Sequence, residues 1–429
     1  MMKGMDDRYM DEKSDILVVE YISSGGFVNT EIPSILFPEG FGMLNSVTRD
    51  FKHCGHNVIV PLDFRIDNYR SFLYVDEVHL VTTERPLTHS IESVSKQLDA
   101  ILIIAPEFSS ILYHLRKLAE QLEIPLLDSS SKVTKIASNK VQTEAILKKR
   151  GISVPDTVIC EISEDLEIIK EKVEEIGYPL IFKPIDGVGC GGLSLVTQEK
   201  QISEAILNIK QNSTLNRFIV QKYIEGTPAS INCISNGKYA LPVSFNAQFV
   251  TFTSPIGGQS EYEGGFTPFQ HELEKKAKKT VMQFPEYFPG LLGYFGVDVI
   301  FREDEVVFIE INPRITTSYI GAKAAIRENI MDLVINAVFE GKLPNEIVPE
   351  QFAYFKRISL SSDVGPLLPL EFFRKSEIIA PPYYDVSGQE EASFFACTTG
   401  RSLESCKSRL LALERDIHNR VNSAISFEK

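Results

Sequence analysis

The sequence has no tryptophan and no excess of basic residues. It contains 44 Lys and Arg against 58 Asp and Glu, which gives a formal net charge of −14 at pH 7. A protein that binds a nucleic-acid backbone as its main partner needs a basic surface, so we expect no nucleic-acid partner. A few local cations and a metal ion are still enough to bind the phosphates of a nucleotide.

Long apolar runs and metal-binding spacings are also missing. No run approaches the ~20 apolar residues that a helix needs to cross a bilayer. The opening residues, MMKGMDDRYMDEKSD, are highly charged and lack the apolar centre of a signal peptide. The six cysteines form no C-x-x-C pair, and the seven histidines show no H-x-x-x-H spacing. We therefore expect a cytoplasmic protein with no membrane partner, no disulfide framework and no zinc site.

What the chain does contain is the composition of an ordinary globular protein. With 429 residues, 43% of them hydrophobic and 24% charged, it is long enough for two or three packed units. The apolar runs DILVVEY (15–21) and AILIIAPE (100–107) read as buried strands. The second run is followed by the helical pattern of residues 108–122. Strands that alternate with helices predict a small parallel α/β domain.

The pattern changes along the chain and suggests five segments of mixed α/β and α+β character. Residues 1–14 are expected to be a flexible tail, and residues 15–130 form the parallel α/β domain. Strands and helices continue to alternate through residues 131–227. Residues 228–344 are richer in strands, and residues 345–429 form a carboxyl-terminal extension that ends in a helix.

A glycine-rich segment follows a strand in FKPIDGVGCGGLSLV. Lys183 ends the strand, and Gly187, Gly189, Gly191 and Gly192 follow it. Glycines allow backbone N–H groups to approach phosphate oxygens, and the lysine adds a positive charge. The segment is not a Walker motif, because no Gly-Lys-Ser/Thr follows, and it does not open a helix as a Rossmann fingerprint would. A phosphate-binding loop and a simple flexible hairpin both remain open.

The strand in FIVQKYIEG (218–226) ends in a mixture of polar and apolar residues. These residues are Gln221, Lys222, Tyr223 and Ile224. Their backbone groups can contact the edge of a flat heterocycle, although an ordinary edge strand has the same pattern.

The stretch GYFGVDVIFREDEVVFIEINPR reads as a hairpin that carries acidic groups. Glu310 and Asn312 lie two residues apart on a strand and so point to the same face. A three-residue turn at 303–305 places Asp298 directly opposite Glu310, whereas a two-residue turn places it on the other face.

In the first arrangement two carboxylates and an amide oxygen converge. Oxygen ligands of this kind suit Mg²⁺ or Mn²⁺ that bridges phosphates. Arg314 follows on the same face if the strand continues past Pro313. The alternative is a solvated polar face.

The order of these motifs resembles the ATP-grasp superfamily of ligases. The motifs are SNK (138–140), the FKP segment with its glycine loop, VQKYIEG, VD and EINPR, and they cover about 132–320. The resemblance implies a pre-ATP-grasp α/β domain, an ATP-grasp domain of two α+β subdomains around the nucleotide, and ATP with Mg²⁺ or Mn²⁺ as cofactors. The subdomains would be residues 131–227 (small) and 228–344 (large, with the metal site).

The resemblance also implies a role for each matching position. It implies that Lys140 and Lys183 contact the phosphates and that the loop from Gly187 to Gly192 covers them. It implies an adenine hinge formed by Gln221, Lys222, Tyr223 and Ile224. It also implies that Asp298, Glu310 and Asn312 are metal ligands and that Arg314 contacts the phosphoryl group in transfer. The chain departs from many relatives in one respect. It lacks their acidic ribose contact after the hinge, where Glu225 is a weak substitute.

A narrower resemblance points to the archaeal tyramine–L-glutamate ligase group of methanofuran biosynthesis, which joins the γ-carboxylate of glutamate to the amine of tyramine. It is carried by EYISSGGF (20–27), EGFGML (39–44), IAPE (104–107), SFNAQ (244–248) and YEGGFTP (262–268). Candidate substrate contacts are Glu20, Glu107, Asn246, Gln248 and Tyr262. Glu20 and Glu107 end predicted strands, where open α/β sheets bind ligands and where a carboxylate can hold an amine.

The two resemblances imply an ATP-dependent ligase that activates a carboxylate as an acyl phosphate and joins it to an amine. The expected partners are these two small molecules, and the sequence leaves room for a homo-oligomer. Two alternatives stay open. One is an ATP-grasp ligase or carboxylase with another substrate pair, such as bicarbonate, because TTGRSLESCKSRL resembles the end of carboxylase-like relatives. The other is an ATP-binding protein without turnover.

Overall fold

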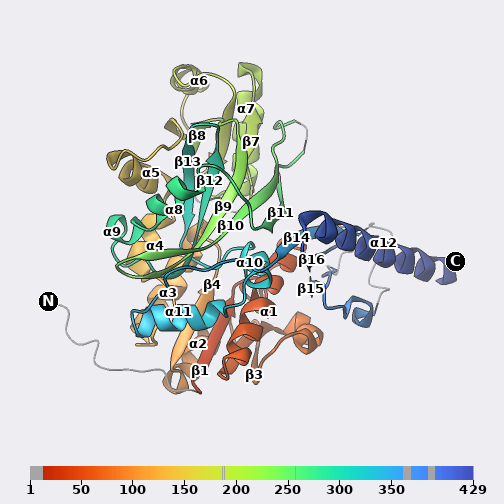
Figure 1. Cartoon of the computed structure of the whole chain (residues 1–429). Coiled ribbons are helices and arrows are strands. Elements are labelled where there is room, and N and C mark those ends of the chain that lie inside the picture. Colours follow the sequence, from red (N-terminus) through yellow and green to blue (C-terminus); the bar gives the residue numbers. More distant parts are fainter. Residues whose placement is uncertain are drawn as a thin grey trace.

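The structure is a computed structural model that describes residues 13–428 except 186, 188, 257, 361–368 and 385–391, without side chains from 422 onward. It confirms the predicted fold class: a parallel α/β unit is followed by units in which antiparallel strands and helices mix (Figure 1). The predicted tail lies, up to residue 12, outside the described residues. Among the helices described, none combines the length and apolar composition needed to cross a membrane.

The N-terminal sheet has four parallel strands in the order β3-β2-β1-β4. These strands are β1 (Asp15–Glu20), β2 (Asn57–Asp63), β3 (Glu77–Val81) and β4 (Ala100–Ile104). Helix α1 (Phe37–His53) packs on one face, and α2 (Leu87–Val94) and α3 (Ile111–Gln121) pack on the other. Both faces of β1 and β4 are therefore buried, which explains their continuous apolar runs. Because β1 and β4 run parallel, their carboxyl ends open at the same edge of the sheet.

A small antiparallel sheet contains Lys183 and begins the glycine loop. Its strand order is β5-β8-β6-β7, with α6 and α7 packed on one face. The strands and helices are β5 (Thr157–Glu161), α6 (Leu166–Glu174), β6 (Leu180–Pro184), β7 (Ser194–Val196), α7 (Ile202–Asn212) and β8 (Arg217–Lys222). The glycine loop joins β6 to β7. Helices α4 (Ser131–Ala137) and α5 (Lys140–Lys149) connect this unit to the N-terminal sheet.

The central sheet has eight antiparallel strands in the order β13-β12-β9-β10-β11-β14-β16-β15. The strands are β9 (Thr227–Asn236), β10 (Ala240–Thr251), β11 (Glu261–Thr267), β12 (Leu292–Phe301), β13 (Val306–Asn312), β14 (Phe352–Ser359), β15 (Ile378–Ala380) and β16 (Ser393–Gly400). Its last three strands belong to the segment 345–429. That segment therefore continues the sheet that residues 228–344 begin.

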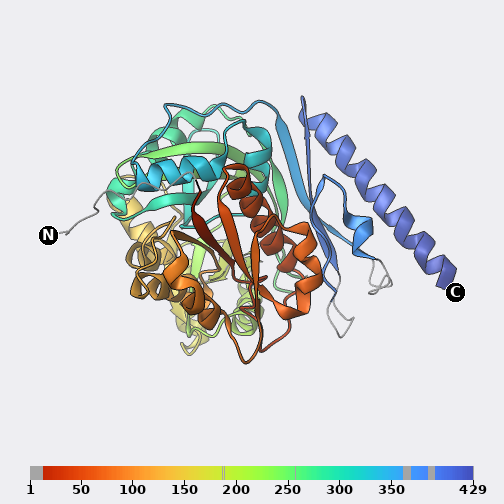
Figure 2. The same cartoon turned by 90° about the horizontal axis from the view of Figure 1, so that it is seen from below.

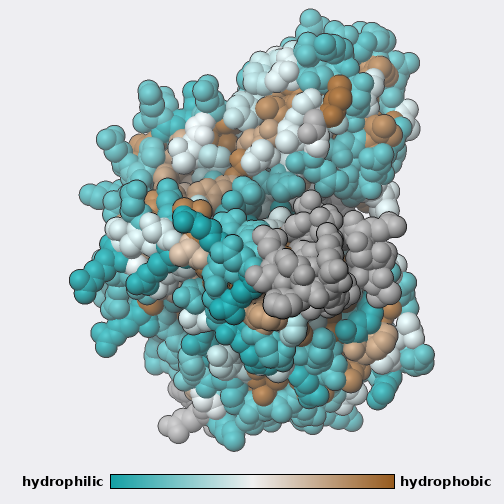
Figure 3. All heavy atoms as spheres, turned by 90° about the vertical axis from the view of Figure 1, so that its right-hand side faces the viewer, coloured by the Kyte–Doolittle hydropathy of each residue, from teal (hydrophilic) through white to brown (hydrophobic). Residues whose placement is uncertain are grey.

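Among the described residues, the part of the chain that forms the central sheet also contains five helices. They are α8 (Glu274–Val281), α9 (Phe284–Tyr287), α10 (Tyr319–Ala325), α11 (Ile330–Phe339) and α12 (Leu403–Glu428). Helix α12 packs against β14 and β16 and runs along the edge of the molecule, as Figure 2 shows. On the coloured part of the face in Figure 3, hydrophilic residues prevail and hydrophobic ones form small separate groups.

One hydrophobic core joins the N-terminal sheet to the central sheet. It contains Ile16 and Val18 of β1, Ile234 of β9 and Tyr294 of β12, all of them 0–1% exposed. A shared core of this kind fixes the carboxyl-terminal edge of the N-terminal sheet against the β12–β13 hairpin.

Candidate active site

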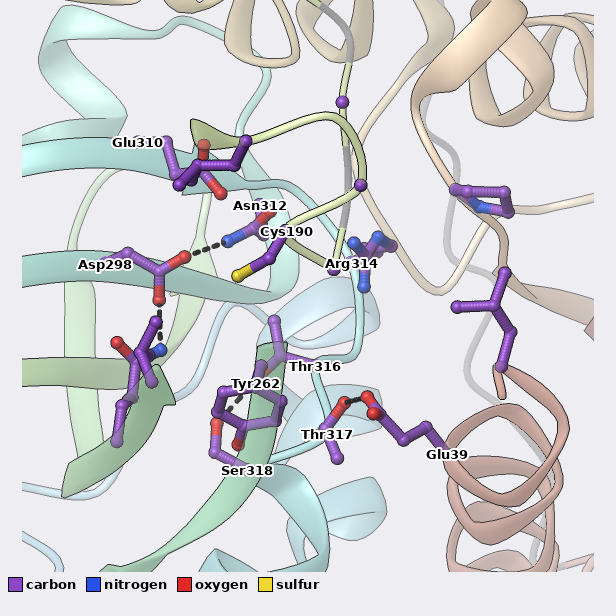
Figure 4. A pocket seen from close by; sticks show the side chains of 18 of the residues that line it. Glu39, Cys190, Tyr262, Asp298, Glu310, Asn312, Arg314, Thr316, Thr317 and Ser318 are labelled. Atoms are coloured by element: carbon purple, nitrogen blue, oxygen red, sulfur yellow. Dashed lines mark hydrogen bonds between the residues drawn. The ribbon is translucent and has the colours of Figure 1, made fainter. Parts of the chain in front are cut away.

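A cavity of about 270 Å³ lies where the three sheets meet. The carboxyl ends of β1 and β4 and the start of α1 form one side, and the glycine loop covers another. The floor is the β12–β13 hairpin with the residues that follow it. Most of the side chains singled out in the sequence therefore border one space (Figure 4).

Two carboxylates face each other across the hairpin. The strands pair from Phe301 with Val306 to Val299 with Phe308, and residues 302–305 connect them. The register then shifts, and Asp298 pairs with Glu310. Without this β-bulge the register of the connection would place Asp298 opposite Ile309, and its side chain would point to the other face.

The connection is therefore not the three-residue turn that we considered. The pairing expected from that turn is nevertheless present, because the bulge at Ile309 supplies the extra residue. Asp298, Glu310 and Asn312 lie together in the cavity.

Two amide groups hold the carboxylate of Asp298. Gln248 Nε2 donates to Asp298 Oδ1 at 2.8 Å, and Asn312 Nδ2 donates to Oδ2 at 3.0 Å (Figure 4). Burial and repulsion by Glu310 raise the pKa of Asp298. Burial alone would also raise the pKa of Glu310, but the nearby Lys140 and Lys183 outweigh it and hold that pKa below its usual range. Positive charge near these two buried carboxylates therefore stabilises their ionised forms.

Two lysines supply positive charge beside the carboxylates. The Asn139 side chain caps α5 by accepting from Gln142 N, and this places Lys140 in the first turn of the helix. Lys140 Nζ lies 3.1 Å from Glu310 Oε2 and donates to the Gly187 carbonyl at 2.8 Å. Lys183, on β6, is 7% exposed, and burial lowers its pKa to about 8 although Glu310 opposes the shift.

The glycine loop bends toward the lysines. Gly187, Gly189 and Gly191 line the cavity, whereas Gly192 does not. Gly189 and Gly192 have φ angles of +58° and +71°, a conformation that glycine adopts easily and other residues rarely do. The loop therefore offers backbone groups close to Lys140 and Lys183.

Arg314 follows the hairpin and is bound by the N-terminal unit. Its Nε and one terminal nitrogen donate to the two carboxylate oxygens of Glu107 at 2.9 and 3.0 Å. Arg314 lines the cavity, while Glu107 lies behind it and borders a smaller adjoining hollow. Both carboxylate oxygens of Glu107 thus bind Arg314, and Glu107 does not line the cavity. From the sequence we expected Glu107 to be a candidate contact for an amine.

The opposite end of the cavity is acidic and apolar. Glu20 is 2% exposed, and its oxygens accept from the backbone N–H groups of Ile22 and Ser23 at 3.2 and 2.8 Å. Burial raises the pKa of Glu20 to about 6. Glu39, near the start of α1, accepts a hydrogen bond from Thr317 Oγ1 at 2.8 Å, and burial raises its pKa. Tyr262 of β11 lies nearby on the cavity wall (Figure 4).

Some predicted residues lie outside the cavity lining. Asn246 is fully buried and donates to the backbone and side-chain oxygens of Ser230. Gln221 donates to Thr157, and Lys222 donates to the carbonyls of Gly177 and Tyr178.

The residues that do not line it are Gly192, Gln221, Lys222, Tyr223, Ile224, Glu107 and Asn246. Tyr223 packs edge-on against Phe252, which does line the cavity. Glu225, the weak ribose candidate, is exposed.

Reasoning from the sequence missed Glu39 and the hydroxyl groups of residues 316–318. Thr316 and Ser318 both donate to the buried Asn232 Oδ1, at 3.3 and 2.8 Å, and all three hydroxyl-bearing residues line the cavity. The signal for Glu39 was its place in EGFGML directly after Pro38 at the start of a helix. The hydroxyl run directly follows Arg314, so its closeness to the hairpin was also visible in the sequence.

The donor set at the hairpin fits a hard divalent cation. Within the described residues no group of three or more Asp, Glu, His and Cys side chains converges as a metal site. The candidate set is therefore two carboxylates and one amide, all offering oxygen atoms, which Mg²⁺ prefers together with oxygens of a phosphate and of water. A cation between the two carboxylates would offset the repulsion by Glu310 that contributes to the raised pKa of Asp298, so the geometry is consistent with such an ion.

Comparisons with known proteins agree with this geometry. Residues 137–318 match the ATP-grasp domain family, and residues 56–133 match the pre ATP-grasp 3 domain family. A tyramine–L-glutamate ligase of Methanocaldococcus jannaschii is 28% identical over 346 residues, which cover 80% of this chain and 94% of that protein.

Solved structures share the fold at lower identity. The biotin carboxylase domain of a Hydrogenobacter thermophilus 2-oxoglutarate carboxylase, in complex with MgADP, ADP and bicarbonate, matches with a TM-score of 0.68 and 16% identity, covering 92% of this chain and 88% of that one. An L-amino acid ligase of Bacillus licheniformis matches with a TM-score of 0.63 and 18% identity, covering 95% and 97%. The chain is thus a ligase of the ATP-grasp superfamily, with a pre-ATP-grasp domain before its ATP-grasp domain, and it is similar to the archaeal tyramine–L-glutamate ligases.

Proposed function

We propose that this chain is an ADP-forming carboxylate–amine ligase that makes an amide through an acyl phosphate. The observation that carries the proposal is the arrangement of charge around one cavity. Asp298 and Glu310 face each other beside Lys140 and Lys183 at one end, and Arg314 is close enough to act on the carboxylates of both ends. The other end holds carboxylates and apolar side chains that suit an amine.

The first end is proposed to hold the triphosphate of ATP. Asp298, Glu310 and Asn312 would hold Mg²⁺, which neutralises phosphate charge when it is bound. Lys140 and Lys183 would contact the phosphates, and the loop from Gly187 to Gly192 would cover them with backbone N–H groups. Mn²⁺ has the same ligand preference and is a second candidate.

The chain contributes chiefly position and charge to the chemistry. An oxygen of the substrate carboxylate attacks the γ-phosphorus, the bond to the bridging oxygen breaks, and ADP leaves. Lys183 and Arg314 stabilise the negative charge that shifts during this transfer. The amine nitrogen then attacks the carbonyl carbon of the acyl phosphate, phosphate leaves, and the nitrogen loses a proton.

No side-chain nucleophile is needed for this sequence of steps. Cys190 projects from the glycine loop toward the cavity, but burial raises the pKa of its thiol to about 12 (Figure 4). A thiol with so little thiolate at neutral pH is a poor nucleophile. Cys190 therefore has no place in the proposed chemistry.

The proposed substrates are L-glutamate and an aromatic amine such as tyramine. The proposal takes them from the name of the 28% identical relative of Methanocaldococcus jannaschii. The acidic and apolar end of the cavity supports an amine of this kind. Gln248 and Tyr262 are candidates for further substrate contacts, since both line the cavity.

The test is ADP release by the purified full chain with ATP, Mg²⁺ and a panel of substrate pairs. We expect turnover with L-glutamate plus tyramine, and an amide product detectable by mass spectrometry. ADP release with bicarbonate alone would instead favour a carboxylase. Tight ATP binding without ADP release under any pair would favour a nucleotide-binding protein without turnover. Because the sequence contains no tryptophan, calorimetry is the suitable binding method.

A further inference from the structure

The acidic end of the cavity has more carboxylates than cations. The carboxylates are Glu20 and Glu39 in the cavity, Glu107 behind it and Glu261 on β11. The guanidinium groups near them are Arg314, which binds Glu107, and Arg357, which lies 2.9 Å from Glu261. Both arginines are therefore already paired.

Glu20 and Glu39 have no cation in direct contact. Neither forms an ion pair with any residue that the structure describes, and the more distant charges of Arg314 and Arg357 offset their burial only in part, so the pKa of each carboxyl group stays raised. Glu20 is 2% exposed and ends β1, and it points to the edge of the sheet where the cavity opens. A buried carboxylate without a direct counter-charge is costly, because burial removes its hydration and the hydrogen bonds and more distant arginines replace that hydration only in part. A bound cation would remove that cost.

The walls around these two carboxylates are apolar. Ile22, Leu36 and Met43 line the cavity together with Ile104 of β4 and Tyr262 of β11. Figure 4 shows Glu39 reaching from α1 toward Thr317 and the cavity, with the Tyr262 ring on β11. A hydrated metal ion fits apolar walls poorly, whereas an organic ammonium with an apolar body satisfies both the charge and the walls.

The absence of a side chain at Gly40 leaves room for the carboxylate of Glu20. A Cβ atom on Gly40, in the first turns of α1, would lie 2.7 Å from Glu20 Oε1. The glycine therefore leaves the space in which the Glu20 carboxylate lies beside the helix. Helix propensity alone would favour alanine here, so the glycine serves the contact with Glu20 rather than the helix.

We propose that Glu39 and Glu20 form the subsite for the nitrogen nucleophile, and that they bind it as a primary ammonium attached to an apolar body. Before the attack the ammonium gives one proton to a carboxylate of this pair, and the free amine that results is the nucleophile. This inference rests on the proposed function for the identity of the second substrate, but its binding step is separate from turnover. It replaces the pair Glu20 and Glu107 considered from the sequence, because Glu107 is held by Arg314. Glu39, which Thr317 orients, takes its place.

The test measures binding to the full chain by calorimetry, without ATP. The probes are tyramine and 4-ethylphenol, which keeps the ring and the ethyl chain but has no ammonium group. Wild type should bind tyramine at least about ten-fold more tightly than 4-ethylphenol, the difference expected for a hydrogen bond between charged groups. Equal affinity for the two probes would overturn the inference.

Two variants and a matched control locate the subsite. Glu39→Gln should weaken tyramine binding about ten-fold or more and leave 4-ethylphenol binding unchanged. Gly40→Ala should also weaken tyramine binding, because it displaces the Glu20 carboxylate without removing a charge. Glu31→Gln makes the same substitution at an exposed residue close in the sequence and should bind tyramine as wild type does.

Unchanged tyramine affinity in both Glu39→Gln and Gly40→Ala, with folding verified by circular dichroism, would overturn the assignment. The outcome does not depend on catalysis. A wild type that binds tyramine through Glu39 but releases no ADP with any carboxylate would contradict the proposed ligase reaction and support this subsite. Turnover with tyramine that Glu39→Gln does not change would support the proposed ligase reaction and contradict this subsite.

Discussion

Lys183 illustrates how burial adjusts a single residue to the proposed chemistry. It lies on the fully buried strand β6, and loss of hydration lowers the pKa of its ammonium to about 8. The lysine is therefore mostly charged at neutral pH and loses its charge within the range where enzymes are commonly assayed. A cation with this little hydration interacts strongly with a phosphate.

We predict that Lys183→Ala lowers ADP formation by roughly 10²–10³-fold, the loss typical of removing one group that stabilises charge in the transition state. Circular dichroism should show an intact fold, since the side chain makes no ion pair that the structure records. Exposed Lys238→Ala is the matched control. Near-normal turnover of Lys183→Ala would remove this lysine from the site.

The same residue predicts a pH dependence. Its ammonium is charged below the pKa of about 8 and neutral above it, so kcat/KM for ATP should fall as pH rises through about 8. Lys183→Arg keeps its charge to much higher pH, and its alkaline decline should move upward even if its overall rate is lower. Identical alkaline declines in the two proteins would assign the titration to another group.

Glu310 predicts the dependence on metal. Glu310→Gln keeps the size of the side chain but removes one of the two facing carboxylates, so the Mg²⁺ concentration for half-maximal activity should rise at least about ten-fold. A titration of activity with Mg²⁺ and with Mn²⁺ measures the change. An unaltered metal dependence would count against the proposed ligand set.

At the scale of elements, the two strands of the hairpin could be predicted from the sequence, but the register in which they pair could not. The apolar runs and the acidic REDE connection predicted two strands, and β12 and β13 confirm them. The bulge at Ile309 was not predictable, because it depends on how β12 also pairs with β9 and how the core fills behind it. From the sequence, the pairing of Asp298 with Glu310 was therefore one of two open alternatives, and the structure shows that it is the one present.

The adenine hinge stays a prediction from resemblance. Its four residues, 221–224, lie at the end of strand β8 and directly after it, and none of them lines the cavity. Gln221 and Lys222 form other hydrogen bonds through their side chains, whereas the predicted adenine contacts use backbone groups, so these bonds do not test the assignment.

Helix α3 and the end of β13 are tied together by a buried arginine. Arg116 is fully buried, its Nε lies 3.0 Å from Asp128 Oδ1, and a terminal nitrogen donates to the Pro313 carbonyl at 2.8 Å. Pro313 separates Asn312 from Arg314, so this contact fixes the segment that carries both. Neither Arg116 nor Asp128 stood out in the sequence.

We predict that Arg116→Met destabilises the fold by roughly 3–5 kcal/mol, because it leaves the buried Asp128 without its cation. The double variant Arg116→Met/Asp128→Leu should recover part of that loss, since it removes both charges together. Calorimetric unfolding measures the order of stability. A double variant less stable than Arg116→Met would show that Asp128 is satisfied by groups other than Arg116.

At the scale of the whole molecule, the site exists only because the N-terminal unit docks on the central sheet. The shared core fixes the two units, and the Glu107–Arg314 pair crosses from the end of β4 to the end of β13. These residues are 207 positions apart in the sequence, and each was singled out separately as a ligand contact. Their pairing is a tertiary feature that composition and periodicity do not contain.

This pairing makes Glu107 a positioning residue for Arg314. The side chains of Arg314 and Glu107 are 14% and 5% exposed, and the two parallel hydrogen bonds fix the plane of the guanidinium group. If Arg314 contacts the phosphoryl group in transfer, a change at Glu107 should act mainly on the rate of transfer and less on the affinity for ATP. A residue that only stabilised the fold would not separate these two quantities.

We therefore predict that Glu107→Gln lowers kcat by about ten-fold or more while the KM for ATP changes much less, because one charged partner of the guanidinium is lost and Arg314 is less well oriented. Steady-state ADP release provides both constants, and Glu123→Gln at an exposed position of the same unit is the control. Calorimetric unfolding shows whether the variant is folded at the assay temperature. If folded Glu107→Gln retains the kcat of wild type, the orientation of Arg314 does not depend on the N-terminal unit.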